Sequence, residues 1–206
     1  MSSDQLPITN YQPRIIGLTG GISTGKSTVA QYLATQYNLP ILDADIYARE
    51  AVQIGSPILT AIAQRYGTDI LLADGSLNRP QLARIIFNNL TEKQWVERQI
   101  HPYVRDRFEQ EINKLSSKAT STTILVIPLL FEAEMTDLVT EIWVVSCTPQ
   151  QQIVRLMQRN NLTLAQAQAR INSQMPLAEK CDRADVILNN SSTLEALKHQ
   201  VDLALM

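Results

Sequence analysis

Eight consecutive residues near the start of the chain have the types and spacing needed to bind phosphate groups. The run from Gly20 to Ser27 reads Gly-Gly-Ile-Ser-Thr-Gly-Lys-Ser and fits the phosphate-loop pattern G-x-x-x-x-G-K-[ST]. Its glycines let successive backbone N–H groups turn toward phosphate oxygens. We expect the Lys26 side chain to be exposed and to have little packing role, so that it can bring charge to the β- and γ-phosphates. The Ser27 hydroxyl would ligate Mg²⁺. The run therefore predicts nucleoside triphosphate binding, with contacts from Gly21, Ile22, Ser23, Thr24, Gly25, Lys26, Ser27 and Thr28.

Two carboxylates that could act as a base, Asp43 and Asp45, lie two residues apart after the apolar run 39–42. One interpretation is that such a carboxylate accepts the proton of an acceptor hydroxyl beside the γ-phosphate. The alternative is that an aspartate caps the helix that follows. We favour a catalytic role for at least one of the two, because a kinase needs such a base next to its phosphate loop.

Three arginines, Arg155, Arg159 and Arg170, flank the pair Asn160-Asn161, where one helical pattern ends and another begins. They could belong to an exposed basic hairpin. They could also form a lid that brings guanidinium groups onto the transferring phosphates when it closes. We favour the lid, because phosphoryl transfer needs more positive charge than one lysine and Mg²⁺ supply.

The two histidines differ in setting. His101 precedes Pro102 and lies one helical turn before Arg105. A packing or capping role and a substrate contact are equally good interpretations of His101. His199 falls in the last helical pattern, and we expect it to face solvent.

The elements that must position these residues alternate between strands and helices. An apolar strand pattern precedes the phosphate loop and a helical pattern follows it. The alternative is a glycine-rich turn that only joins a strand to a helix, and such a turn would not need the Lys-Ser pair. Between 57 and about 116 the pattern is helical only, and helical patterns also cover about 149–159 and 163–173. Alternating elements predict a parallel sheet whose ligands bind at the C-terminal ends of the strands. The strands expected are 14–19, 39–43, 123–127, 141–146 and 184–188.

The composition excludes several classes of protein. The chain has 206 residues and a formal net charge of −2, so no overall basic field favours nucleic acid. No apolar run approaches the ~20 residues of a membrane span, and we expect no secretory signal at the start of the sequence. Cys147 and Cys181 lack metal-ligand spacing. We expect reduced thiols in a cytoplasmic protein.

Several of these motifs occur in an order that resembles the dephospho-CoA kinase family, from about residue 14 to the C-terminus. The motifs that carry the resemblance are Gly17–Ile22 leading into Gly25-Lys26-Ser27, Asp43-Ala44-Asp45, His101-Pro102, Pro128-Leu129-Leu130-Phe131-Glu132 and Arg159…Arg170…Gln174. The resemblance implies a P-loop NTPase fold of the α/β class. This fold would have a five-stranded parallel sheet flanked by helices, an inserted helical substrate-binding domain and a helical lid.

This resemblance also implies a division of the chain. Residues 1–12 show no periodicity, so we expect a flexible leader at 1–13, and the resemblance implies a single kinase domain at 14–206. Within that domain, the nucleotide-binding core would take 14–54, 117–148 and 184–206, the CoA-binding insertion 55–116, and the lid about 149–183.

By the same resemblance, the chain would use ATP and Mg²⁺ to phosphorylate the ribose 3′-hydroxyl of dephospho-CoA, giving coenzyme A and ADP. Asp45 would be the base, assisted by Lys26 and Arg159, and Arg170 would also contact ATP. We expect no nucleic acid or membrane partner, and a monomer or weak homo-oligomer. The residues near the acceptor would be Thr19, Asp45, Arg49, His101, Arg105, Pro128, Leu129 and Leu130.

The sequence departs from the family pattern at Ser23-Thr24, where Gly-Ser is usual, and at Asn160-Asn161, where Asp-Gly is common. Asn tolerates positive φ, so the lid turn can be kept. Another small-metabolite kinase is the nearest rival, but it would lack the helical block with His101. A regulatory GTPase would need N-K-x-D, whereas the residues at 113–116 read Asn-Lys-Leu-Ser. A nucleotide sensor would not need the base and the lid arginines.

Overall fold

The computed structural model describes residues 13–116 and 122–206. The expected leader at 1–13 lies outside these ranges except for Pro13, and so do residues 117–121 of the expected core. Among the helices in the two ranges, none is long and apolar enough to cross a membrane.

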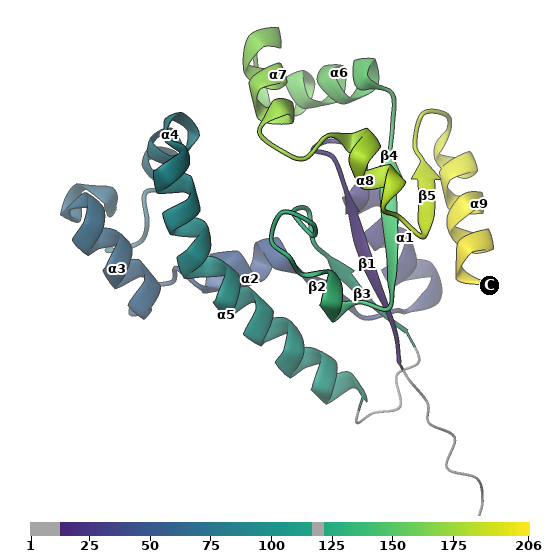
Figure 1. The fold of residues 1–206 in the computed structure, drawn as a ribbon, viewed down its shortest axis with the longest axis horizontal. Helices are drawn as coiled ribbons and strands as arrows, with labels where there is room; N and C mark the ends of the chain where they lie inside the picture. The colour runs from purple at the N-terminus through teal and green to yellow at the C-terminus, as the bar shows by residue number, and fades with distance from the viewer. Residues whose placement is uncertain (1–12, 117–121) are drawn as a thin grey trace, which may run out of the picture.

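A five-stranded sheet with all pairs parallel organises the fold, as predicted. The strand order is β2-β3-β1-β4-β5, so the strand that leads into the phosphate loop lies in the centre of the sheet (Figure 1). Two strand boundaries shift by two residues from the sequence prediction, at the start of the second strand and of the fifth. The strands are β1 (Arg14–Gly20), β2 (Ile41–Asp43), β3 (Thr122–Val126), β4 (Glu141–Ser146) and β5 (Val186–Asn189).

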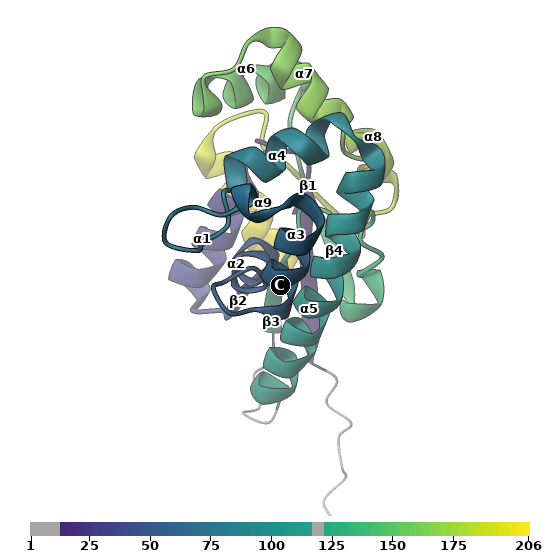
Figure 2. The same ribbon diagram turned by 90° about the vertical axis from the view of Figure 1, so that its left-hand side faces the viewer.

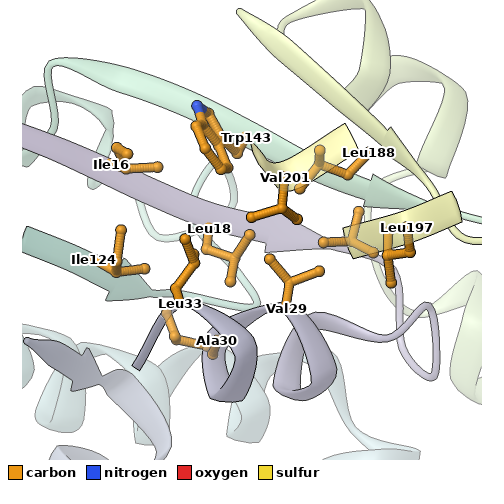
Figure 3. Close-up of a cluster of buried hydrophobic side chains, with 12 residues drawn as sticks. Ile16, Leu18, Val29, Ala30, Leu33, Ile124, Trp143, Leu188, Leu197 and Val201 are labelled. Carbon is orange, nitrogen blue, oxygen red and sulfur yellow. The ribbon is translucent and has the colours of Figure 1, made fainter. Parts of the chain in front are cut away.

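Helices cover both faces of the sheet, because alternate residues of each buried strand point to opposite sides. On one face, Ile124 of β3 packs with α1 (Lys26–Tyr37) and α9 (Leu194–Leu205) (Figure 3). On the other face, Leu125 packs with α2 (Ala44–Glu50) and α5 (Leu90–Ser116). The near-continuous apolar sequence of β3 is explained by this two-sided burial.

On the face covered by α1 and α9, every second side chain of β1 points into the hydrophobic core. Ile16 and Leu18 are fully buried there, and Leu33 of α1 and Val201 of α9 pack against them (Figure 3). Burying an aliphatic side chain of this size contributes about 1.5–3 kcal/mol relative to leaving it exposed. This packing holds α1 with its N-terminus at the end of β1.

A separate hydrophobic cluster holds together the helical region at 57–116, which contains α3 (Pro57–Tyr66), α4 (Arg79–Asn88) and all of α5. Figure 2 shows these helices in front of the sheet. The expectation of helices alone is wrong in one detail, since Leu71 and Leu77 form an antiparallel bridge. A turn at Gly75, where φ is 81°, brings these two leucines together.

Beyond the end of β4, the chain forms α6 (Pro149–Asn160) and α7 (Leu164–Asn172), close to the helices predicted there (Figure 1). Asn161 ends α6 with φ 50° and ψ 51°, so the positive φ expected at this turn is confirmed. A third helix, α8 (Leu177–Asp182), was not predicted. It has six residues, which is too short for a periodic pattern, and its position depends on a contact described below.

Candidate active site

The phosphate loop joins β1 to the N-terminus of α1, so its amides and the positive end of the helix dipole face the same space. Gly25 is the N-cap, with φ 111° and ψ 18°. A Cβ at Gly25 would collide with the side-chain amide of Asn190. Both the backbone conformation and this close approach therefore require glycine.

Three side-chain amides from distant parts of the chain hold the loop. Gln152 of α6 donates to the Ile22 carbonyl at 2.9 Å, and Asn190 donates to the Thr24 carbonyl at 2.8 Å. The Gln174 side-chain oxygen accepts from the Ile22 N–H at 3.1 Å. Gln174 belongs to the predicted lid pattern, but these three supports were not predicted, because nothing local in the sequence marks an amide that acts across the fold.

Lys26 lies folded over the loop that carries it. Its ammonium donates to the carbonyls of Gly20 and Gly21, at 3.1 and 2.7 Å. The expectation of an exposed side chain is wrong, since Lys26 is only partly exposed. Burial and the nearby Lys180 ammonium lower the pKa of Lys26 to about 8, while Asp45 opposes the shift.

A cavity of about 1030 Å³ opens where the loop, the ends of β2 and β3, the helical region and α6 meet. This is the edge of the sheet at which ligands were expected. Its lining brings together many of the predicted site residues, namely Ile22, Ser23, Gly25, Lys26, Ser27, Thr28, Asp45, His101, Pro128, Leu129 and Arg159.

The two aspartates of this cavity differ in what they bind. An Asp43 carboxylate oxygen accepts from the Asp45 N–H at 2.8 Å and caps α2. Burial raises the pKa of Asp43. Asp45 lies in the first turn of α2 and is exposed along the cavity. The capping alternative thus holds for Asp43, and Asp45 remains the candidate base.

The charges of the cavity are segregated. Lys26, Arg155 and Arg159 line the side of the loop and α6, whereas Asp45 and Glu97 line the side of α2 and α5. Such an arrangement can bind a polyphosphate on one side and place a carboxylate near a hydroxyl group on the other.

Two buried polar atoms beside the phosphate loop have no hydrogen-bond partner within the described part of the chain. They are the Ser23 hydroxyl and the Nη1 atom of Arg155, and both residues line the cavity. The other terminal nitrogen of Arg155 donates to the Asn190 carbonyl at 3.1 Å. Buried polar groups in native proteins are normally paired. These two atoms are suited to pair with the oxygens of a bound anion.

Arg105, predicted near the acceptor, lies outside the cavity lining. Its guanidinium pairs with both carboxylate oxygens of Asp137 at 2.8 Å and donates to the Glu134 carbonyl at 2.9 Å. Arg105 therefore holds the loop that follows β3, and that loop carries Pro128 and Leu129 of the cavity wall.

Other predicted residues also lie apart from the described cavity lining. Thr19, Thr24 and Leu130 are fully buried, and Gly21 is buried next to the side chain of Gln152. Two predicted arginines are exposed elsewhere. Arg170 lies on α7, and Arg49 lines a smaller cavity of about 450 Å³.

The sequence did not identify the apolar wall of the cavity. Val96, Ile100 and Val104 have helical spacing, which is typical of a packing face and does not by itself indicate a cavity. In the structure this stripe of α5 packs into the hydrophobic clusters and also lines the cavity. The remaining lining residues outside the prediction include Ile86, Ala133, Met135 and Gln158.

His101 lies on α5 beside this apolar wall. It is partly buried, and burial lowers its pKa while the carboxylate of Glu97 opposes the shift. The imidazole is therefore mainly neutral at pH 7, and a neutral imidazole can both donate and accept a hydrogen bond.

Comparison with known proteins gives one consistent result. The sequence model of the family described as dephospho-CoA kinase matches residues 14–196. A Nostoc sp. protein named dephospho-CoA kinase is 64% identical over 192 residues, covering 93% of this chain and 96% of that protein. The Synechocystis sp. protein of the same name is 59% identical, covering 91% and 92%. The solved structure of dephospho-CoA kinase from Campylobacter jejuni is 25% identical, with a TM-score of 0.71 and coverage of 94% and 96%.

Proposed function

The chain belongs to the dephospho-CoA kinase family, and we propose that the cavity described above is where ATP phosphorylates the ribose 3′-hydroxyl of dephospho-CoA. The chain is an enzyme, a kinase that phosphorylates dephospho-CoA in coenzyme A biosynthesis. The observation that carries the proposal for the site is that the phosphate loop and Asp45 line one cavity. A nucleotide sensor would have no need of this arrangement.

On the donor side, the amides of the loop and the N-terminus of α1 would bind the triphosphate. Lys26 would exchange its contacts to Gly20 and Gly21 for phosphate oxygens, and Arg155 and Arg159 would add charge from α6. Arg170, exposed on α7, would reach the phosphates only after the lid at about 149–183 closes.

On the acceptor side, we propose that the helical insertion at 55–116 and the wall after β3 hold dephospho-CoA. Asp45 would accept the proton of the hydroxyl, and His101 would orient the acceptor. The apolar stripe of α5 and the side chains of Pro128 and Leu129 would contact its less polar part. Arg49, which lies on α2 with Asp45 and lines the smaller cavity, would meet the acceptor's far end.

The donor atoms near the loop fit a hard divalent cation, since the Ser27 hydroxyl and the carboxylates of Asp43 and Asp45 all line the cavity. We propose that Ser27 and the phosphate oxygens would hold Mg²⁺. When bound, the ion would neutralise charge on the phosphates. The positioning of both substrates comes from the residues of the chain named above.

A mass spectrum of dephospho-CoA after incubation with the protein, ATP and Mg²⁺ tests the proposed function. We expect one added phosphoryl group on the ribose 3′-oxygen, located by fragmentation. A mixture without ATP is the control. Phosphorylation of a nucleoside monophosphate in a parallel mixture, with dephospho-CoA unchanged, would contradict the proposal.

We expect the affinity for ATP to fall as the pH rises above about 8, because Lys26 loses its proton there in the free protein. Bound phosphate favours the ammonium form, so the pKa of Lys26 rises in the complex. The affinity for ATP therefore has its full value below pH 8, where Lys26 is protonated in both the free protein and the complex. Above it, affinity falls by up to about tenfold per pH unit until the pKa of the complex is reached. Calorimetric titration at pH 7, 8 and 9 measures the slope, and a Lys26→Ala variant with the same slope would contradict this assignment.

The segment from Arg159 to Gln174 is expected to gain protection from hydrogen exchange when ATP binds. In this segment, α7 buries little more than Ala167, and regions with few buried contacts open most easily. Exchange measured by mass spectrometry with and without ATP checks the prediction, with α9 as an internal reference that should not change. Equal protection of the segment in both states would rule out the lid.

A further inference from the structure

We infer that Lys180 and Glu132 are a positioning pair that aligns the acceptor wall of the cavity with the phosphate loop. The acceptor wall is the segment Pro128–Glu132, and this inference rests on the proposed function of the cavity. Neither member of the pair lines the cavity, so both act through other residues.

The lysine of the pair is buried to an unusual degree. The side chain of Lys180 has 0% exposure, while that of Glu132 has 25%. The Lys180 ammonium lies 2.9 and 3.1 Å from the two carboxylate oxygens of Glu132. It also donates to the Pro128 carbonyl at 3.0 Å. The short helix α8 is thus tied to the acceptor wall by one side chain with three close contacts.

Glu132 continues the connection toward the donor side. One of its carboxylate oxygens accepts from the Met175 N–H at 3.0 Å. The preceding residue, Gln174, accepts from the Ile22 N–H of the phosphate loop. A path of hydrogen bonds and one peptide unit therefore runs from Ile22 through residues 174–175 and the ion pair to Pro128.

A second contact sets the position of the same carbonyl. The Thr19 hydroxyl, at the end of β1, donates to the Pro128 carbonyl at 3.3 Å. The Pro128 carbonyl is thus held both by the strand that carries the phosphate loop and by α8. Pro128 and the neighbouring Leu129 line the cavity. A displacement of this carbonyl would move the wall against which the acceptor binds.

Stability alone gives a weak reason for an ion pair whose lysine is fully buried. Removing the charge of Lys180 from water is costly even with Glu132 beside it, and an apolar pair of similar volume is often equally or more stable. Here, however, an apolar pair would leave the Met175 N–H without its partner and remove one donor from Pro128. What the charged pair provides is a defined spacing between these two backbone groups.

Three variants separate positioning from packing. Lys180→Met removes the ammonium and keeps an unbranched apolar side chain. The double variant Lys180→Met/Glu132→Leu removes both charges, so it leaves no unpaired charge if the single variant fails to fold. Glu141→Gln is the matched control, because it weakens the Arg14–Glu141 ion pair at the start of β4, at the opposite edge of the sheet from the cavity.

For the single and the double variant we expect kcat/KM for dephospho-CoA to fall about 10- to 100-fold, the scale of a displacement of about 1 Å near a reacting group. The affinity of both variants for ATP alone should stay within about threefold of the wild-type value, because Gln174 and the loop are retained. Glu141→Gln should keep the wild-type kcat/KM for dephospho-CoA and the wild-type affinity for ATP. The double variant should unfold within a few degrees of the wild type.

Two results would overturn the inference. One is a folded double variant that restores kcat/KM for dephospho-CoA, which would mean that the site needs only packing there. The other is a loss of affinity for both substrates in equal proportion, which would indicate general loosening. Wild-type turnover of dephospho-CoA is measured in the same series. A failure of the proposed function would therefore appear as an inactive wild type and be distinguished from a failure of the pair.

Discussion

Lys26→Ala is expected to abolish measurable phosphoryl transfer, a loss of about 10³-fold or more. Removing a single charged or hydrogen-bonding group from a phosphoryl-transfer or oxyanion site typically costs about 10²- to 10⁵-fold. The Lys26 ammonium folds back onto the phosphate loop, where it donates to the carbonyls of Gly20 and Gly21. No arginine of α6 can replace it there, because Arg155 and Arg159 approach the cavity from a different element.

The fold should survive this change. The loop keeps its contacts to Gln152, Gln174 and Asn190. Burial lowers the pKa of Lys26 to about 8, so at pH 7 the ammonium is less favourable in the folded chain than in water. Its removal therefore should not lower the free energy of unfolding.

The measurement is kcat with dephospho-CoA, together with thermal unfolding of the same sample. Lys198→Ala is the control and should retain wild-type turnover. The Lys198 ammonium lies 5.6 Å from the centre of the Tyr32 ring, and neither residue lines the cavity. An unfolded Lys26→Ala variant, or one with turnover near the wild type, would count against the assignment of Lys26.

Asp45→Asn is expected to lower kcat on dephospho-CoA by about 10²-fold or more, the range for losing general-base assistance. A ribose hydroxyl is a weak nucleophile at neutral pH. A carboxylate can orient it and take its proton as the phosphoryl group arrives, whereas an amide can only orient it. Asparagine has the same size and remains compatible with the first turn of α2, so the geometry of the site is kept.

The Asp43→Asn variant is the matched control, because it distinguishes a capping carboxylate from a catalytic base. Asparagine caps helices about as well as aspartate, so an Asp43 that only caps α2 predicts a nearly normal enzyme. Binding of ATP should change little in either variant, because the loop supplies most of it. If Asp43→Asn is inactive and Asp45→Asn is active, the base is Asp43. If both are active, the proton leaves by another route.

Much of the architecture follows from local sequence. The apolar runs predicted all five strands, and the pattern at 20–27 predicted the link between β1 and α1. These features depend on periodicity and on backbone chemistry, which neighbouring residues determine. The position of the cavity also followed, because parallel strands place their C-terminal ends at one edge.

The parts that could not be predicted depend on contacts between distant residues. The sequence shows that Arg105 is positively charged but not whether it binds a substrate or Asp137, because that depends on which residues the fold brings next to it. Lys180 belongs to a residue type that is rarely buried, and nothing in its local sequence marks it as a member of a buried ion pair. In the same way, the apolar stripe of α5 could not reveal that part of it borders a cavity.

The contacts of the phosphate loop also determine when the ATP site can form during translation. The loop leaves the ribosome early, but β1 pairs with β3 and β4, more than a hundred residues later in the chain. Its last support, Asn190, contacts the Thr24 carbonyl across 166 residues. Contacts of such long range are slow to form, because the intervening chain must first close on itself. We therefore expect ATP to find no finished site on the nascent chain, and to assist folding only after translation has passed Asn190.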